Sequence, residues 1–114
     1  MLYFERYSQS LELLDKALEN YQASNEEDVY LLYLIYFLKA QAYLPLAKYD
    51  ECLDAYNKCL EAYNRCLNEV PEVVNEDDIF TIYQGLGHLY ETKGEFKMAQ
   101  EYYQKCLDHF GEDS

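Results

Sequence analysis

The sequence predicts an all-α protein, a stack of about five antiparallel helices in one domain covering residues 1–114. Apolar residues recur at helical spacing along most of the chain. Glycine and proline are scarce, with four and two residues, whereas an all-β fold with many turns needs more of both. The chain also repeats one pattern of aromatic and small residues, in which Tyr36 corresponds to Tyr83, 47 positions later.

A leading helix is predicted within residues 1–22. Its apolar and aromatic residues recur every three or four positions and form one stripe. The members of this stripe are Tyr7, Leu11, Leu14, Ala17, Leu18 and Tyr21.

A second helix is predicted from about residue 26 to residue 44. Ser24 and Glu27 have the spacing of a capping box before it, and Pro45 ends it. Its central run, residues 29–38, is apolar nearly all round, so we expect neighbours to cover this helix on both sides. The run is shorter than the roughly 20 residues that cross a bilayer, which favours a buried helix over a membrane span.

A third helix is predicted from Ala47 to about residue 69, where Pro71 ends it, so that residues 26–69 form a first hairpin. After an acidic loop, Asn75 is expected to cap a fourth helix that continues to about Lys93.

The fourth and fifth helices are predicted to form a second hairpin, residues 76–110. Gly94 supplies the positive φ that the turn between them needs. The fifth helix runs from about residue 95 to residue 109, and the helical pattern stops at Gly111.

The two hairpins share eight residues at matching intervals, and the leading helix matches the second half of this unit. Tyr36, Ala40, Tyr43, Tyr49, Cys52, Tyr56, Cys59 and Leu60 correspond to Tyr83, Gly87, Tyr90, Phe96, Ala99, Tyr103, Cys106 and Leu107. In the leading helix, the same second-half spacings fall on Tyr7, Ser10, Leu14, Ala17 and Leu18.

This pattern resembles the tetratricopeptide repeat family, strongly over residues 80–113 and more loosely over residues 33–66. Tyr83 stands where tryptophan is usual and Cys106 where alanine is usual, and in the looser unit Lys39 replaces the leucine of the pattern. The resemblance implies a right-handed α-α superhelix, in which small residues let helices approach closely and aromatic residues fill the gaps between hairpins.

The chain departs from the family pattern in two ways. Its units lie 47 residues apart instead of the usual ~34, because the third helix is longer and a loop over residues 70–78 is added. It also begins with an unpaired half-unit. Since at least three repeats are expected for stability, we expect a homodimer in which a neighbour supplies the missing half-unit.

The resemblance implies a peptide-binding groove on the concave face, formed by the first helix of each hairpin. The predicted groove residues are Leu34, Phe37, Gln41, Leu44, Thr81, Gln84, His88 and Glu91. For Leu34 and Phe37, plain core packing is an equally good interpretation. The basic residues with which chaperone-binding family members hold a C-terminal carboxylate are absent from these positions, so that class of ligand is excluded.

The net charge of −13 favours basic or apolar protein partners over acidic ones and disfavours nucleic acid and anionic membranes. No motif pairs a nucleophile with a base, so we expect no enzyme, cofactor or metal site. Cys52, Cys59 and Cys66 lie about 10.5 Å apart along one helix, too far to share a zinc ion or a disulfide. They are predicted to be packing residues, with Cys66 a candidate exposed thiol.

We therefore expect a cytoplasmic scaffold for protein or peptide binding through the concave groove. Two alternatives remain open. The longer helices resemble units in bacterial peptide-responsive regulators, so the chain can be read as the ligand-sensing or dimerising segment of one. A structural self-assembly segment is the other alternative, and it predicts tight oligomers with an occluded groove.

Overall fold

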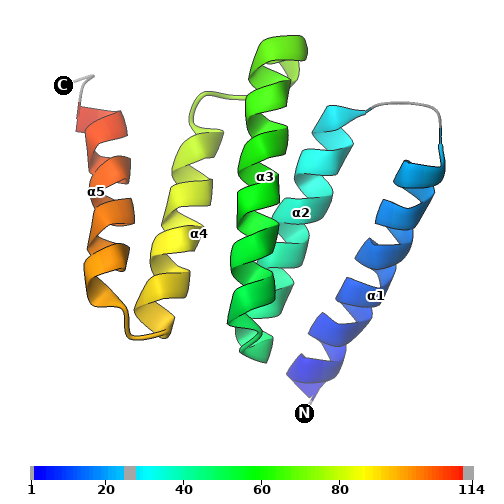
Figure 1. Ribbon diagram of the computed structural model, residues 1–114, viewed down its shortest axis with the longest axis horizontal. Helices are drawn as coiled ribbons and strands as arrows, with labels where there is room; N and C mark the ends of the chain where they lie inside the picture. Colours follow the sequence, from blue (N-terminus) through cyan, green and yellow to red (C-terminus); the bar gives the residue numbers. More distant parts are fainter. Residues whose placement is uncertain (1, 25–27, 112–114) are drawn as a thin grey trace.

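The computed structural model describes residues 2–24 and 28–111, which are helical for most of their length and contain no strand. Its elements are α1 (Leu2–Ala23), α2 (Val29–Tyr43), the 3₁₀ helix η1 (Leu44–Leu46), α3 (Tyr49–Glu69), the 3₁₀ helix η2 (Pro71–Val73), α4 (Asp78–Thr92) and α5 (Phe96–Gly111). Neighbouring helices in the chain are neighbours in space, from α1 at one end to α5 at the other (Figure 1). The predicted all-α fold is thus confirmed.

The start of α2 differs from the expected capping box. The helix begins at Val29, and the cap is Asp28, whose Oδ1 accepts a hydrogen bond of 3.1 Å from the Leu31 amide. Ser24 instead closes the end of α1, where its hydroxyl donates to the Tyr21 carbonyl. Glu27 lies outside the described residues. Asp is as good a cap as Ser, and Asp28 directly precedes the first residue of the helix.

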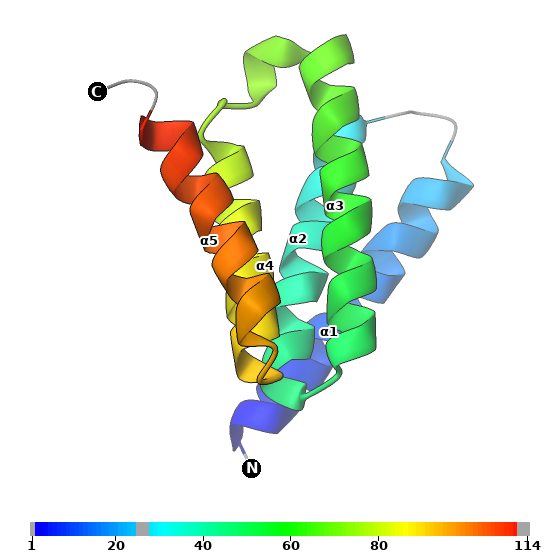
Figure 2. The ribbon, with the colours of Figure 1, turned by 60° about the vertical axis from the view of Figure 1, so that its left-hand side comes forward.

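The helix α4 begins at Asp78 with Asp77 as its N-cap residue, so the predicted cap, Asn75, lies two residues earlier and acts on the turn that leads into the helix. Asn75 Oδ1 accepts from the Asp77 amide at 3.0 Å, while Asp78 Oδ2 accepts from the Asn75 amide at 3.1 Å. The buried Tyr63 of α3 donates its hydroxyl to the Asn75 carbonyl at 2.9 Å and so ties this loop to α3. The extra length expected of the first hairpin lies in α3, which has 21 residues against 16 in α5 and extends past its neighbours to reach this loop (Figure 2).

The turns within the two hairpins have the same backbone conformation but different residues. Gly94 has φ 84°, as its turn requires, and Ala47 occupies the corresponding place in the first hairpin with φ 59°. A left-handed conformation costs an L-residue with a side chain roughly 1–2 kcal/mol, whereas glycine adopts it freely. Ala47 is therefore a strained position that the repeat pattern alone did not identify.

Replacing Ala47 with glycine is expected to stabilise the protein by about 0.5–1 kcal/mol, because relief of this strain exceeds the greater entropy of glycine in the unfolded chain. Gly94→Ala is the matched change and is expected to destabilise, although a Cβ there meets no atom within 4 Å. Urea titration followed by circular dichroism measures both. A loss of stability in Ala47→Gly would contradict the account of this turn.

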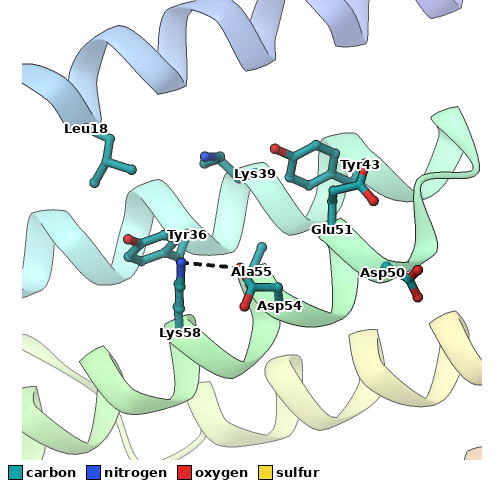
Figure 3. A pocket seen from close by; sticks show the side chains of 9 residues that line it. All are labelled: Leu18, Tyr36, Lys39, Tyr43, Asp50, Glu51, Asp54, Ala55 and Lys58. Atoms are coloured by element: carbon teal, nitrogen blue, oxygen red, sulfur yellow. Dashed lines mark ion pairs between the residues drawn. The ribbon is translucent and has the colours of Figure 1, made fainter.

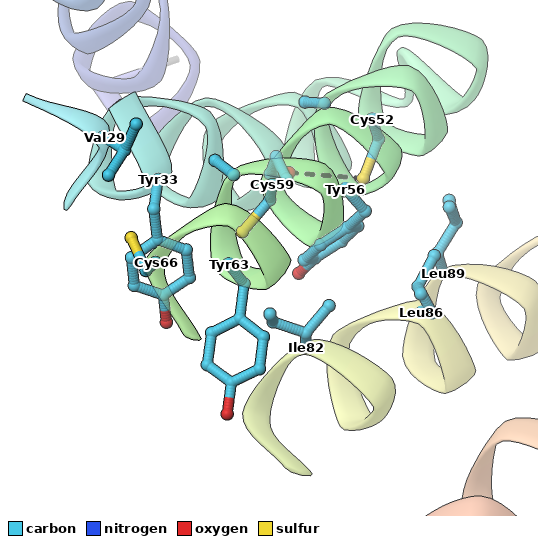
Figure 4. Packing of buried hydrophobic residues seen from close by; sticks show 13 residues of the cluster. Val29, Tyr33, Cys52, Tyr56, Cys59, Tyr63, Cys66, Ile82, Leu86 and Leu89 are labelled. Carbon is cyan, nitrogen blue, oxygen red and sulfur yellow. Dashed lines mark hydrogen bonds between the residues drawn. The ribbon is translucent and has the colours of Figure 1, made fainter. Parts of the chain in front are cut away.

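The core lies between α2, α3 and α4 (Figure 4). Its fully buried members include Cys52, Cys59 and Cys66 from α3 and Ile82, Leu86 and Leu89 from α4. Small residues such as Ala40 and Ala62 are buried among them, which lets the helix backbones approach closely.

The expectation that α2 is covered on both sides is only partly correct. It packs against α1 and against α3, yet Leu31 and Leu38 remain 42% and 47% exposed. By length and composition, the stretch Val29–Leu46 is apolar enough to cross a membrane. A core helix that is mostly buried meets the same criterion; in this stretch 28% is buried, at Val29, Tyr33, Ile35, Ala40 and Ala42.

The prediction that Cys66 has an exposed thiol is wrong. Cys66 is buried beside Val29 and Tyr33, because α3 is long enough for its last turns to pack on the start of α2 (Figure 4). Burial raises the pKa of Cys52 to about 11 and that of Cys59 to about 12, and it raises the pKa of the Cys66 thiol as well. The packing interpretation of these residues holds.

All four thiols are expected to be unreactive in the folded protein, because each is buried and its thiolate is disfavoured. Titration with a thiol-reactive chromophore at pH 8 should label none of them quickly in the native protein and all four in guanidinium chloride. Rapid labelling of Cys66 in the native protein would contradict the packing of α3 on α2.

Candidate binding groove

A single cavity of about 490 Å³ contains five of the eight residues predicted for the concave face. Gln41 and Leu44 reach it from the end of α2 and the start of η1, and Thr81, Gln84 and His88 reach it from α4. The three α4 residues lie three or four positions apart, so they share one face of that helix. The first helices of the two hairpins therefore form the two walls of one groove.

The remaining three predicted residues lie elsewhere. Leu34 and Phe37 are partly buried and pack against the core, which is the alternative that the sequence left open for them. Glu91 lies at the rim and is exposed. Its Oε1 accepts a long hydrogen bond of 3.5 Å from the Tyr103 hydroxyl and lies 3.8 Å from His88 Nδ1.

Two tyrosines that the sequence pattern assigned only to packing also line the groove. Tyr56 of α3 and Tyr103 of α5 lie between the two walls. Pro45 and Gly85 line the same cavity. The repeat pattern identifies both tyrosines as gap-filling aromatics. It does not distinguish Tyr56, which is buried, from Tyr103, which packs its ring and stays partly exposed at the groove.

Two glycines of α4 allow these tyrosines to lie so close. A Cβ at Gly85 would overlap the Tyr56 hydroxyl, and a Cβ at Gly87 would come within 2.7 Å of the Tyr103 ring. Burial also raises the pKa of Tyr56, so its hydroxyl stays protonated and able to donate. The groove floor is thus formed by aromatic rings fitted against bare helix backbone.

None of the described lysines and arginines lines the groove. The lysines whose ammonium groups lie over aromatic rings are on other surfaces. Lys58, for example, is 5.6 Å from the centre of the Tyr36 ring, and Lys105 is 5.4 Å from that of Tyr83. The groove instead offers the amides of Gln41 and Gln84 and the hydroxyls of Thr81 and Tyr103, which can both donate and accept.

This arrangement suits binding rather than catalysis. Amides and hydroxyls spaced along a groove can pair with the N–H and C=O groups of a bound main chain, and the tyrosine rings can contact apolar side chains. Within residues 2–24 and 28–111, no group of three or more His, Cys, Asp or Glu side chains is placed to hold a metal ion.

Comparison with known proteins gives one match. Residues 31–112 match the family model of the tetratricopeptide repeat, which covers both hairpins and most of the chain. No curated protein and no solved structure matches the chain.

Proposed function

Since the chain belongs to the tetratricopeptide repeat family, a family of protein-interaction scaffolds, we propose that it binds a segment of a partner protein in the groove between α2 and α4. The observation that supports this most is the convergence of Gln41, Leu44, Thr81, Gln84 and His88 on one cavity. These residues come from two repeats, so a ligand that contacts both walls spans the array. We propose no catalytic activity.

The proposed ligand is an extended or helical peptide that is basic or apolar, not acidic. Among the described residues the groove has no lysine or arginine to neutralise a carboxylate, and the chain carries a net charge of −13. Approach of a basic partner is favoured by this field, whereas nucleic acid and anionic membranes are repelled.

We also propose a homodimer formed through an apolar slot between α1 and α2. The slot, a cavity of about 370 Å³, is lined by Tyr7, Ser10, Leu13, Leu14, Leu38, Gln41 and Ala42. Leu13 is 68% exposed there, whereas the residue at the corresponding place of α3, Ala55, is buried under α2. The slot is the place where the first helix of a preceding hairpin would pack, and a second copy is the proposed occupant.

Light scattering over a concentration series tests the homodimer, with Leu13→Glu as the disrupting variant. A wild-type mass of two chains that falls to one chain in the variant supports it. A monomer mass for the wild type at every concentration contradicts it.

One further observation favours the peptide-responsive regulator as a second candidate function. Gln41 lines both the groove and the slot, so a peptide in the groove lies next to the proposed dimer contact. Under this second proposal, a bound peptide changes the dimer dissociation constant, whereas a simple scaffold shows no such change.

The groove proposal is tested by selecting binders from a random peptide library displayed on phage and measuring their affinity by fluorescence anisotropy. Gln84→Lys and Thr81→Lys place a cation on the groove wall at exposed positions, and Asn57→Lys on α3 is the matched control outside the groove. Because the added cation repels a basic peptide and is unfavourable beside an apolar one, we expect at least a tenfold loss of affinity for the two groove variants and little change for Asn57→Lys. Equal affinities for all three would contradict the proposal.

A further inference from the structure

Lys39 occupies a core position of the repeat. It corresponds to Leu86 in the second hairpin, which is fully buried. The Lys39 side chain is only 13% exposed, and its Nζ lies 2.8 Å from Asp15 Oδ1 of α1. Figure 3 shows Lys39 in the space between α1 and α2, near Tyr43.

The pair between Lys39 and Asp15 has a cost that leucine would avoid. The nearly buried Lys39 ammonium loses much of its hydration, and the Asp15 side chain is 56% exposed, so solvent screens their attraction and it does little more than compensate for that loss. Breaking the pair is nevertheless unfavourable, because the ammonium stays nearly buried and loses the carboxylate that contacts it. A pair of this kind therefore contributes little to the free energy of unfolding. It does, however, make packing of α2 against a helix with a carboxylate at this place more favourable than packing against a helix without one.

Like α1, the helices α3 and α5 carry the pattern of the second helix of a repeat, so their residues can be matched with those of α1 by position. The residue in the place of Asp15 is Asn57 in α3 and Gln104 in α5. Gln104 is already engaged with its own helix, since its Nε2 donates to Asp108 Oδ1 at 2.9 Å. Of the three helices, only α1 places a carboxylate opposite Lys39.

The outer face of α5 is the face on which a following hairpin would pack, and here it is exposed. Tyr49 and Leu60 of α3 pack against the core in the first hairpin, whereas their counterparts in α5, Phe96 and Leu107, are 63% and 66% exposed. The α1 residues in these places are Tyr7 and Leu18. Thus α5 of a second copy presents to α2 the same pattern of apolar residues as α1.

The contact that keeps α1 on α2 is modest. Among the described side chains of α1, only Leu11 is buried, and the rest of its apolar stripe is half-buried. A second copy's α5 is therefore a real competitor for the same face of α2. Stacking of this kind is head-to-tail, and wherever the rotation between copies does not close a ring it extends into open polymers.

We infer that the Asp15–Lys39 ion pair selects α1 over the α5 helix of a second copy as the neighbour of α2, and thereby prevents open head-to-tail stacking of this chain. The charges carry the selection: α1 places the carboxylate of Asp15 against Lys39, whereas α5 has the neutral Gln104 in the corresponding place. The inference does not depend on what the groove binds.

The test is the solution mass of full-length Lys39→Leu by light scattering over a concentration series, compared with wild type. We expect a mass that exceeds the wild-type value and keeps rising with concentration, without a plateau. Adding Leu107→Glu on α5 should restore the wild-type mass. Lys58→Leu is the matched control, since Lys58 is an exposed lysine of α3 paired with Asp54, and it should leave the mass unchanged.

Asp15→Asn provides a second variant that adds no apolar surface. It should raise the mass in the same concentration-dependent way, because Lys39 then favours neither helix. A wild-type mass for both Lys39→Leu and Asp15→Asn would overturn the inference. So would a rise in mass that persists after Leu107→Glu, because the polymer would not then use α5. Circular dichroism of each variant confirms that the compared proteins are folded.

Discussion

Leu86→Ala is expected to lower the free energy of unfolding by about 2–5 kcal/mol, the usual cost of removing most of a buried leucine side chain. Leu86 is fully buried in the middle of α4, where α4 packs against the core formed with α3. The cavity left behind would lie between the two hairpins, and the backbones of packed helices cannot easily collapse into it. A loss of this size is a large part of the total stability of a small domain.

Urea denaturation followed by circular dichroism measures the effect of Leu86→Ala. Leu67→Ala is the matched control, since Leu67 lies near the end of α3 and is exposed, so its loss should be much smaller. Equal losses in the two variants would mean that α4 does not pack on α3 as described.

Ala99→Leu is expected to destabilise the second hairpin by about 1–3 kcal/mol through overpacking. Ala99 is buried near the start of α5, at one of the places where the repeat requires a small residue. The added side-chain atoms have no space unless α5 moves away from α4. Proteolysis is then expected to cleave first in α5.

Gln100→Leu is the control for Ala99→Leu. It adds a leucine one residue further along α5 at an exposed position, so the unfolding midpoint should change little. An unchanged midpoint in Ala99→Leu would show that the repeat register assigned to α5 is wrong.

The fold was predictable because its signals are periodic and redundant. Helical spacing, the 47-residue echo and the breaks near Pro45, Pro71 and Gly94 all indicate the same five helices. Exact boundaries were less well determined. The capping box predicted at Ser24 placed the start of α2 too early, and the structure has Asp28 as the cap.

The groove was predictable in part. On α4, polar residues mark the outward face, and Thr81, Gln84 and His88 all reach the cavity. On α2, nearly every residue is apolar, so the pattern cannot tell a groove wall from a core face. For this reason Leu34 and Phe37 were predicted for the groove although they pack against the core. Gln41, one of the few polar residues of α2, does lie in the groove.

Contacts between distant parts of the chain could not be predicted from the pattern. Lys39 was recognised as a departure from the family leucine, but its partner Asp15 lies on another helix 24 positions earlier. The burial of Cys66 likewise depends on how far α3 extends along α2. Both features follow from helix placement, which periodicity does not supply.

The groove is the central claim, and amide chemical-shift mapping tests it most directly. A library-selected peptide is titrated into the ¹⁵N-labelled protein, and the shifted amide signals are assigned. We predict that the largest shifts lie along α2 and α4 at Gln41, Thr81, Gln84 and His88, with little change on the outer face of α3 around Asn57. Shifts confined to α1, to α5 or to the outer face of α3 would contradict the groove as the binding site.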